Sequence, residues 1–222
     1  MNAQLDHLVV IAASLDEGVA WCEATLGLTP GPGGQHALMG THNRLFSIAS
    51  PVFPLAYFEI IAIDPAAAPP ARRRWFDLDD SALQERLHRD GPQLAHWAAR
   101  VNDAHAAVAA LQAQGIARGA VIAASRPTPQ GLLQWQITVR DDGQRLYDGC
   151  LPTLIQWGAV HPAAAMPASG VTLSSLELQH PQAETLARAC QALDLQGVPV
   201  QPGPARLRAR LQTPKGAIEI CS

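Results

Sequence analysis

Short apolar runs and segments of helical character alternate along the 222-residue chain, and their order repeats. Residues 5–11 are mostly apolar, which predicts a strand that is buried on both faces. Ser14 then opens a capping box, which predicts a helix over 15–26. Further strands follow, and the last of them is the apolar segment 57–63. The pattern therefore predicts a first βαβββ module over residues 1–64.

The same order of elements returns twice further along the chain. Residues 93–101 predict a strand, and Asn102 or Asp103 caps the helix that follows. Later strands complete a second module over 93–158. A third, degenerate βαβββ-like module occupies 171–222. The recurrence of element order and of cap chemistry, at low residue identity, indicates an internal repeat and an α+β fold.

The segment 65–92 differs in composition from the modules on either side of it. Its prolines predict a linker, and residues 81–89 predict a short helix within that linker. Arg72, Arg73 and Arg74 follow one another ahead of this helix. The simpler interpretation is a solvated linker, and the alternative is contact with an anionic ligand.

Composition and charge exclude several classes of protein. Hydrophobic residues make up 48% and charged residues 16%, which argues against disorder. The formal net charge of −3 gives neither the basic footprint of a nucleic-acid binder nor a polybasic membrane surface. No membrane span or signal peptide is evident, so we expect a cytoplasmic protein whose four scattered cysteines are free thiols.

Polar side chains interrupt the buried strands at corresponding places in the first two modules. His7 and His96 lie in the opening strands, and Glu59 and Gln156 lie in the closing strands. A buried carboxylate is costly without a partner. Two imidazoles and a carboxylate suit Fe, Mn, Zn, Ni or Co, and an amide oxygen adds a fourth ligand. If the modules pair about a pseudo-twofold axis, these side chains converge on a divalent metal ion; the alternative is histidines bonded to the backbone and a glutamate bonded to arginine.

With these four residues, the sequence resembles the vicinal oxygen chelate superfamily, and within it the glyoxalase-like domain proteins. The resemblance covers roughly residues 4–160, and its most specific part is the Gly-Gly-x-His-x-x-Met-Gly-Thr-x-Asn stretch. It rests on the segments 5–10, 33–43, 57–64, 96–98, 126–135 and 151–157.

The resemblance implies paired modules that curl into a cup-shaped mixed sheet with helices on the outside. It also implies a divalent metal ion in the cup, held by the first and last strands of each module. Carried onto this chain, those places are His7, Glu59, His96 and Gln156. The implied activity is that of a lyase, isomerase or dioxygenase, which acts on a small oxygen-rich molecule by stabilising an oxyanion on the metal.

The departures from the family pattern keep other functions open. Glyoxalase I-like enzymes place a carboxylate where this chain has Gln156, which cannot act as a base, so typical glyoxalase I activity is not expected. The third module has Ser175 in place of a histidine, although Glu219 matches Glu59 and stands as a reserve ligand. The second hypothesis is a metal-free small-molecule binding protein of the bleomycin-resistance type, and the third is a structural or regulatory module.

Further side chains are candidates for contact with a substrate. His36 and Asn43 are expected at the mouth of the cup, or else they satisfy backbone groups in a turn. Arg126 precedes a proline and is predicted to be extended, where it binds a substrate carboxylate or pairs with Asp141 or Asp142. Glu59 or His42 would serve as the catalytic base. Because one chain carries all the modules, we expect a monomer or a homodimer, and we assign no role to the histidines at 88, 105, 161 and 180.

Overall fold

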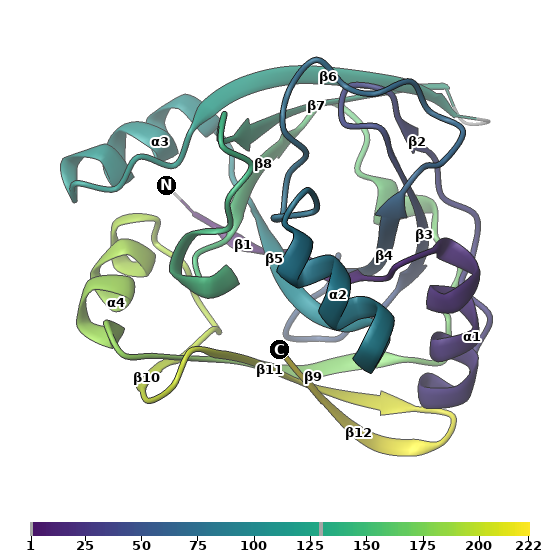
Figure 1. Ribbon diagram of the computed structural model, residues 1–222. Coiled ribbons are helices and arrows are strands. Elements are labelled where there is room, and N and C mark those ends of the chain that lie inside the picture. Colours follow the sequence, from purple (N-terminus) through teal and green to yellow (C-terminus); the bar gives the residue numbers. More distant parts are fainter. Residues whose placement is uncertain (1, 129–130) are drawn as a thin grey trace.

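The computed structural model describes residues 2–128 and 131–222 of the chain. Residues 129 and 130, which fall within one segment of the resemblance, lie outside the described part. The fold is α+β, as predicted, with a curled mixed sheet of eight strands and a second sheet of four (Figure 1). We call the concave face of the larger sheet the cup.

The first unit forms one half of the larger sheet. Its elements are β1 (Gln4–Ile11), α1 (Leu15–Leu26), β2 (Gln35–His36), β3 (Thr41–Ser47) and β4 (Tyr57–Ile63). The hydroxyl of Ser14 accepts the N–H of Glu17 at 3.2 Å and so caps α1. Gly27 ends the helix with a φ of 79°, a left-handed conformation that glycine adopts without strain. The cap and stop signals in the sequence therefore set both ends of α1.

The second unit forms the other half of the sheet with the same topology. Its elements are β5 (Gln93–Arg100), α3 (Ala104–Ala113), β6 (Ala120–Thr128), β7 (Gly131–Val139), the short 3-10 helix η1 (Leu146–Gly149) and β8 (Thr153–Trp157). The opening strands β1 and β5 pair antiparallel, and each also pairs in parallel with the closing strand of its own unit. The strand order β2-β3-β4-β1-β5-β8-β7-β6 is consequently symmetric about the β1–β5 pair.

The third unit contains the predicted elements in a different arrangement. It comprises β9 (Thr172–His180), α4 (Ala183–Ala192), β10 (Val200–Pro202), β11 (Arg206–Thr213) and β12 (Gly216–Cys221), and the 3-10 helix η2 (Pro162–Ala165) precedes it. The opening strand β9 pairs with β10 and β11, and β12 is an edge strand. Glu219 on β12 pairs with the exposed Arg210 at 3.1 Å. The correspondence between Glu219 and Glu59 therefore does not hold, because the closing strand does not lie beside the opening one.

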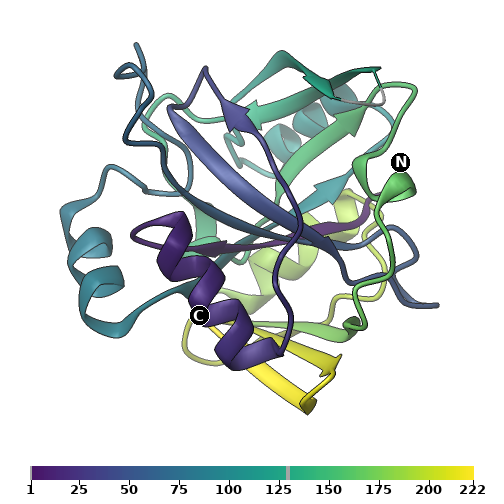
Figure 2. The same cartoon turned by 90° about the vertical axis from the view of Figure 1, so that its right-hand side faces the viewer.

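Two apolar clusters stabilise the fold on opposite faces of the larger sheet. The larger cluster lies on the convex face and joins both sheets, α1, α3 and α4; Leu8, Phe58 and Leu176 are among its fully buried members. The smaller cluster fills part of the cup and includes Val9 and Ile61. Figure 2 shows α1 beside the second sheet, where the ammonium of Lys215 donates to the carbonyl at the end of that helix. Since both clusters use strand β1, the strand has apolar residues on both faces, as the sequence predicts.

The linker between the first two units contributes to the cup as well as connecting the units. It contains α2 (Ser81–Asp90), which Asp80 caps. Ahead of the helix, Trp75 and Phe76 are buried in the smaller cluster, with their rings stacked 5.3 Å apart. Phe76 has a φ of 61°, which is rare for a bulky residue and costs backbone energy. The linker is thus a packed part of the cup wall at this point.

Two arginines of the triplet in the linker form ion pairs with aspartates. Arg72 pairs with Asp141 at 3.1 Å, and Arg74 pairs with Asp79 at 2.6 Å.

The sequence also led us to expect no membrane-spanning helix and no disulfide bonds. In the described part of the chain, no helix is long and apolar enough to cross a membrane. The four cysteines are free thiols, and three of them are buried.

Candidate functional site

A β-bulge places the first polar residues of the cup. Leu5 pairs with Ala99 and His7 pairs with Ala98, so Asp6 is an extra residue in β1 without a partner across the strands. Asp6 and His7 are both buried, and the His7 ring donates from Nδ1 to an Asp6 oxygen at 2.6 Å. The bulge therefore lets two neighbouring side chains interact within a strand whose residues otherwise alternate between faces.

Asp6 is the centre of a cluster of hydrogen-bond donors. Its second oxygen accepts from the indole of Trp157 and from Nε2 of His161, each at 2.9 Å. Burial acts to raise the pKa of Asp6, but the hydrogen bonds from His161 and His7 hold it well below its usual range. Asp6 is therefore an anion that fixes the orientation of His7. Asp6 and His161 are not among the site residues predicted from the sequence, although Asp6 is a second polar residue inside a buried strand.

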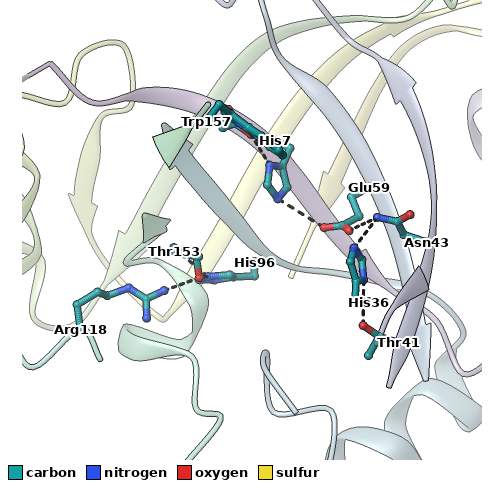
Figure 3. Close-up of polar contacts among 10 residues, drawn as sticks. His7, His36, Thr41, Asn43, Glu59, His96, Arg118, Thr153 and Trp157 are labelled. Atoms are coloured by element: carbon teal, nitrogen blue, oxygen red, sulfur yellow. Dashed lines mark hydrogen bonds and ion pairs between the residues drawn. The ribbon is translucent and has the colours of Figure 1, made fainter. Parts of the chain in front are cut away.

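A chain of polar contacts leads from His7 along the first unit, as Figure 3 shows. Nε2 of His7 lies 3.5 Å from one oxygen of Glu59. The other oxygen accepts from the Asn43 amide at 2.6 Å. That amide also lies 3.4 Å from Nε2 of His36, whose Nδ1 lies 3.1 Å from the hydroxyl of Thr41. Four of the predicted site residues are thus brought together on β1 to β4.

Burial keeps His36 neutral beside the Glu59 side chain. Burial lowers the pKa of His36 to about 4, so the ring is neutral near pH 7. The oxygen of the Asn43 amide accepts the N–H of Gly34 at 2.8 Å, which leaves its NH₂ group directed at Glu59. His7 also stacks on Tyr57, with ring centroids 4.5 Å apart. Glu59 is consequently a positioned carboxylate, 6% exposed, on the wall of the cup.

The second histidine belongs to a separate cluster. Nδ1 of His96 donates to the carbonyl of Gly149 at 3.0 Å, and Nε2 accepts the N–H of Thr153 at 3.2 Å. Burial and the nearby Arg118 hold the pKa of His96 well below its usual value. Arg118 itself is buried and donates to the Thr153 hydroxyl. Figure 3 shows this cluster apart from the one around Glu59, and Phe76 packs on the His96 ring at 5.1 Å.

Strand register explains why the two halves differ. In the first unit, Val9 of β1 pairs with Glu59 of β4. Ala98 of β5 occupies the same place in the second unit as Val9 does in the first, and it pairs with Thr153 of β8. Thr153 thus holds the place of Glu59, and its hydroxyl lies 3.0 Å from Nε2 of His96. The hydroxyl replaces the carboxylate that the first half presents to the cup.

Two predicted residues lie on the other side of the sheet. The Gln156 oxygen accepts the N–H of Ala104 at 2.8 Å, which is the first residue of α3, so the side chain faces that helix on the convex side. His42 precedes Asn43 in β3 and faces away from the cup by strand alternation, with Nδ1 at 3.9 Å from Asp64. The structure therefore does not bring Gln156 or His42 to the cluster around Glu59.

The residues present do not fit the divalent metal ion that the sequence predicts. Both ring nitrogens of His96 are used within the fold, and Gln156 lies on the convex face. Throughout residues 2–128 and 131–222, no group of three His, Cys, Asp or Glu side chains lies close enough to hold a metal. The set His7, Glu59, His96 and Gln156 is accordingly not assembled as a ligand sphere.

A small inner hollow opens where the polar cluster meets an aromatic wall. Its volume is about 40 Å³, and Glu59, His7 and Asn43 form one side. Trp135, Trp157 and other apolar residues of β7 and β8 form the opposite side. Larger outer hollows of about 490 Å³ and 400 Å³ adjoin it. The outer volumes fall in the range of small-molecule sites.

Arg126 projects from β6 into this region. It pairs in register with Leu133 of β7, and both residues line the inner hollow. Its guanidinium lies against Gly34, where a Cβ would come within 2.1 Å of Nη1. Neither Asp141 nor Asp142, the partners considered from sequence, pairs with it; they pair instead with Arg72 and Arg140.

Comparisons with known proteins agree with the fold and the resemblance. A family model described as "Glyoxalase-like domain" matches residues 5–193. A crystal structure of a hypothetical protein from Staphylococcus aureus is 14% identical, with a TM-score of 0.63 over 91% of this chain and 87% of that chain. A methylmalonyl-CoA epimerase from Mycobacterium tuberculosis is 20% identical, with a TM-score of 0.40 over 72% of this chain and 91% of that chain. A Streptomyces coelicolor methylmalonyl-CoA epimerase variant in complex with 2-nitronate-propionyl-CoA is 18% identical, with a TM-score of 0.43 over 71% and 96%. No curated protein matches the sequence. At 14% identity, the Staphylococcus aureus structure shows similarity of fold alone.

Proposed function

Because this chain belongs to the glyoxalase-like domain family, we propose that its cup binds a small organic molecule directly, without a metal ion between protein and ligand. The observation that carries the proposal is the inner hollow, where the Glu59 carboxylate faces a wall of tryptophans. A pocket with a few fixed polar groups and apolar walls is typical of small-molecule sites. This is the metal-free alternative of the sequence analysis, and it is supported by a donor set that does not assemble around a metal.

The aromatic wall indicates a ligand with a flat apolar part. Trp135 and Trp157 lie 5.7 Å apart in neighbouring strands, and Trp75 enters from the linker. Burial of a ring against such a wall removes apolar surface from water and is the main source of affinity. The polar side, formed by Glu59 and Asn43, then fixes the orientation of groups that donate hydrogen bonds.

Binding of N-phenyl-1-naphthylamine, a neutral aromatic probe whose fluorescence increases in apolar surroundings, tests this proposal. Protein made without a His-tag and dialysed against a chelator is expected to bind the probe as tightly as protein supplied with Zn²⁺ or Mn²⁺. Leu133 lines the inner hollow, whereas Leu132 beside it is 57% exposed. We expect Leu133→Asn to weaken binding at least fivefold and Leu132→Asn to leave it unchanged. Binding that requires added metal, or equal loss in both variants, would overturn the proposal.

A second candidate function is proton transfer by Glu59, and one observation favours it. The aspartate–histidine pair of Asp6 and His7 ends 3.5 Å from the Glu59 oxygen that Asn43 does not occupy. A buried carboxylate with a free lone pair toward the hollow can take a proton from an acidic C–H of a bound ligand. His7 is then placed to donate a hydrogen bond to that carboxylate when its ring is protonated.

Deuterium exchange tests the second candidate. 1-Acetonaphthone carries an aromatic ring and acidic hydrogens beside its carbonyl, so we expect the protein in D₂O to speed their exchange. Glu59→Gln should remove this rate increase while N-phenyl-1-naphthylamine still binds. His42→Gln is the matched control, because His42 lies outside the cup and its loss should leave the exchange rate unchanged. Exchange no faster than in buffer would leave the cup as a binding site without this chemistry.

A further inference from the structure

Arg126 stands apart from the other charged groups around the cup. In the described chain it takes part in no ion pair, whereas Arg72, Arg74, Arg140 and Arg145 each have an aspartate partner. Its Nη1 is buried and has no hydrogen-bond partner among the described residues. A buried donor without a partner loses the free energy of its hydration, so a ligand acceptor at that place is favoured.

The position of Arg126 connects the hollows of the cup. Within the described residues, Arg126 alone lines the inner hollow and both outer hollows. The inner volume of about 40 Å³ accommodates a single functional group, since one water molecule occupies about 30 Å³ in the liquid. The body of a ligand must therefore extend outward past the Arg126 side chain.

The charges around the cup favour one orientation of such a ligand. Glu59 is at the inner end, and Asp6, hydrogen-bonded to His7, is a second anion nearby. An anionic ligand group is repelled from that end and attracted to the guanidinium, whose planar N–H groups match a carboxylate in geometry. Gly34 makes room for the guanidinium, because any side chain there would displace Nη1.

From these observations we infer that Arg126 is an anion-binding subsite, and that the ligand of the cup is an aromatic or alicyclic carboxylate. The carboxylate pairs with Arg126 at the junction of the hollows, and the ring packs in an outer hollow of about 400 Å³, which Trp75 and Trp135 also line. This inference rests on the proposed function and adds the chemical class of the ligand. The cup would take a neutral ring without Arg126, but it would lose its preference for an acid.

Competition between two matched probes tests the inference. 1-Naphthylacetate and 1-naphthylacetamide have the same ring and nearly the same shape, and only the first is an anion at pH 7.5. Each is titrated against the full-length protein carrying N-phenyl-1-naphthylamine. We expect the carboxylate to displace the reporter at a concentration at least about tenfold lower than the amide. The preference should decrease as ionic strength rises, because the attraction is between charges.

Three variants locate the effect. Arg126→Gln should reduce the preference to about one while the neutral reporter still binds. Gly34→Ala keeps the charge but inserts a Cβ where Nη1 lies, so it should reduce the preference as well. Arg44→Gln removes an exposed arginine on the convex side of β3 and should change nothing.

The outcomes separate this inference from the proposed function. Equal displacement by acid and amide, or a preference that survives Arg126→Gln, would overturn the anion subsite and leave the binding cup intact. Failure of all three probes to bind would overturn both, and the melting temperature of each variant shows whether it is folded.

Discussion

Thr153 and Glu59 occupy matching places, and the difference between them determines what each half of the cup does. The carboxylate of Glu59 keeps one oxygen toward the hollow. The hydroxyl of Thr153 is instead used by His96 and by the buried Arg118. One half of the cup therefore presents a charged acceptor, and the other half has become a closed hydrogen-bond cluster that stabilises the fold.

The closed cluster makes stability depend on pH through His96. The unfolded chain takes up a proton at this histidine near pH 6.5, whereas the folded protein resists protonation because the ring is buried beside Arg118. The unfolded state then binds more protons below pH 6.5, so the free energy of unfolding decreases as pH falls. His36, whose pKa burial lowers to about 4, contributes with the same sign.

We expect the free energy of unfolding, measured in urea, to decrease by up to about 1.4 kcal/mol per pH unit for His96 below pH 6.5. His96→Gln should reduce this slope by about that amount, even though the variant is less stable at pH 7. His88→Gln, on the surface of α2, should keep the slope of the parent protein. An unchanged slope in His96→Gln would show that His96 binds its proton equally in the folded and unfolded states, which would contradict the prediction.

At the scale of elements, paired bulges set the geometry of both halves. Asp6 is the extra residue in β1, and Ala95 is the extra residue in β5, since Val9 pairs with His96 and Val10 with Leu94. Each bulge stands directly before the histidine of its strand. The backbone of the site is thus repeated, while the side chain at the bulge is an aspartate in one unit and an alanine in the other.

Gln156 caps the N-terminal end of α3. The first N–H groups of α3 have no partner within the helix, and Asp103 and Gln156 satisfy those of Ala106 and Ala104. We expect Gln156→Ala to lower the free energy of unfolding by about 0.5–2 kcal/mol, as loss of a helix cap does. Binding of N-phenyl-1-naphthylamine should not change.

Gln134→Ala is the control for this prediction, because Gln134 is exposed on the neighbouring β7. Its effect on stability should be within about 0.5 kcal/mol, the usual range for surface substitutions. If Gln156→Ala weakened probe binding without a loss of stability, the Gln156 side chain would face the cup and would not cap α3.

Much of the element pattern could be predicted from the sequence, and register could not. Apolar runs and caps gave the strands, α1 and α3 close to their observed ends. Gln156 was selected as the polar residue of the closing strand, but the register of β8 against β5 puts Thr153 in the place of Glu59 and leaves Gln156 on the convex face. His42 and Asn43 are adjacent in one strand, so alternation already implied that only one of them faces the cup. Asp6 is visible in the sequence as a second polar residue in a buried strand, but no local pattern predicts the β-bulge that brings its side chain to His7.

At the scale of the whole molecule, the two sheets share one core. The cluster on the convex face contains Leu5 and Trp97 from the larger sheet and Leu173 and Leu211 from the smaller one. Strands β11 and β12 also contact β5 directly. The third unit therefore covers a surface of the larger sheet that would otherwise be exposed and apolar.

We expect the two sheets to unfold in a single transition, because neither can keep its apolar surface buried alone. All tryptophans lie at or before residue 157, so their fluorescence reports on the larger sheet. Cys190 is a buried thiol in α4 and reports on the third unit when it becomes reactive.

The measurement uses a variant that keeps Cys190 as its single cysteine. Urea midpoints from tryptophan fluorescence and from thiol labelling should coincide within about 0.3 M, given the usual uncertainty of such fits. The tryptophan midpoint of the four-cysteine parent is the control for the substitutions. Thiol exposure at clearly lower urea would show that residues 171–222 form a separate folding unit.

The unlike halves of the cup have a consequence for stereochemistry. A framework with twofold symmetry and identical contents would accept a ligand in two orientations related by that axis. Here Glu59, Arg126 and the tryptophan wall form three chemically different parts of the lining of one hollow. Three distinct contacts around one centre distinguish a molecule from its mirror image, so the two enantiomers of a chiral aromatic acid are expected to bind with different affinities.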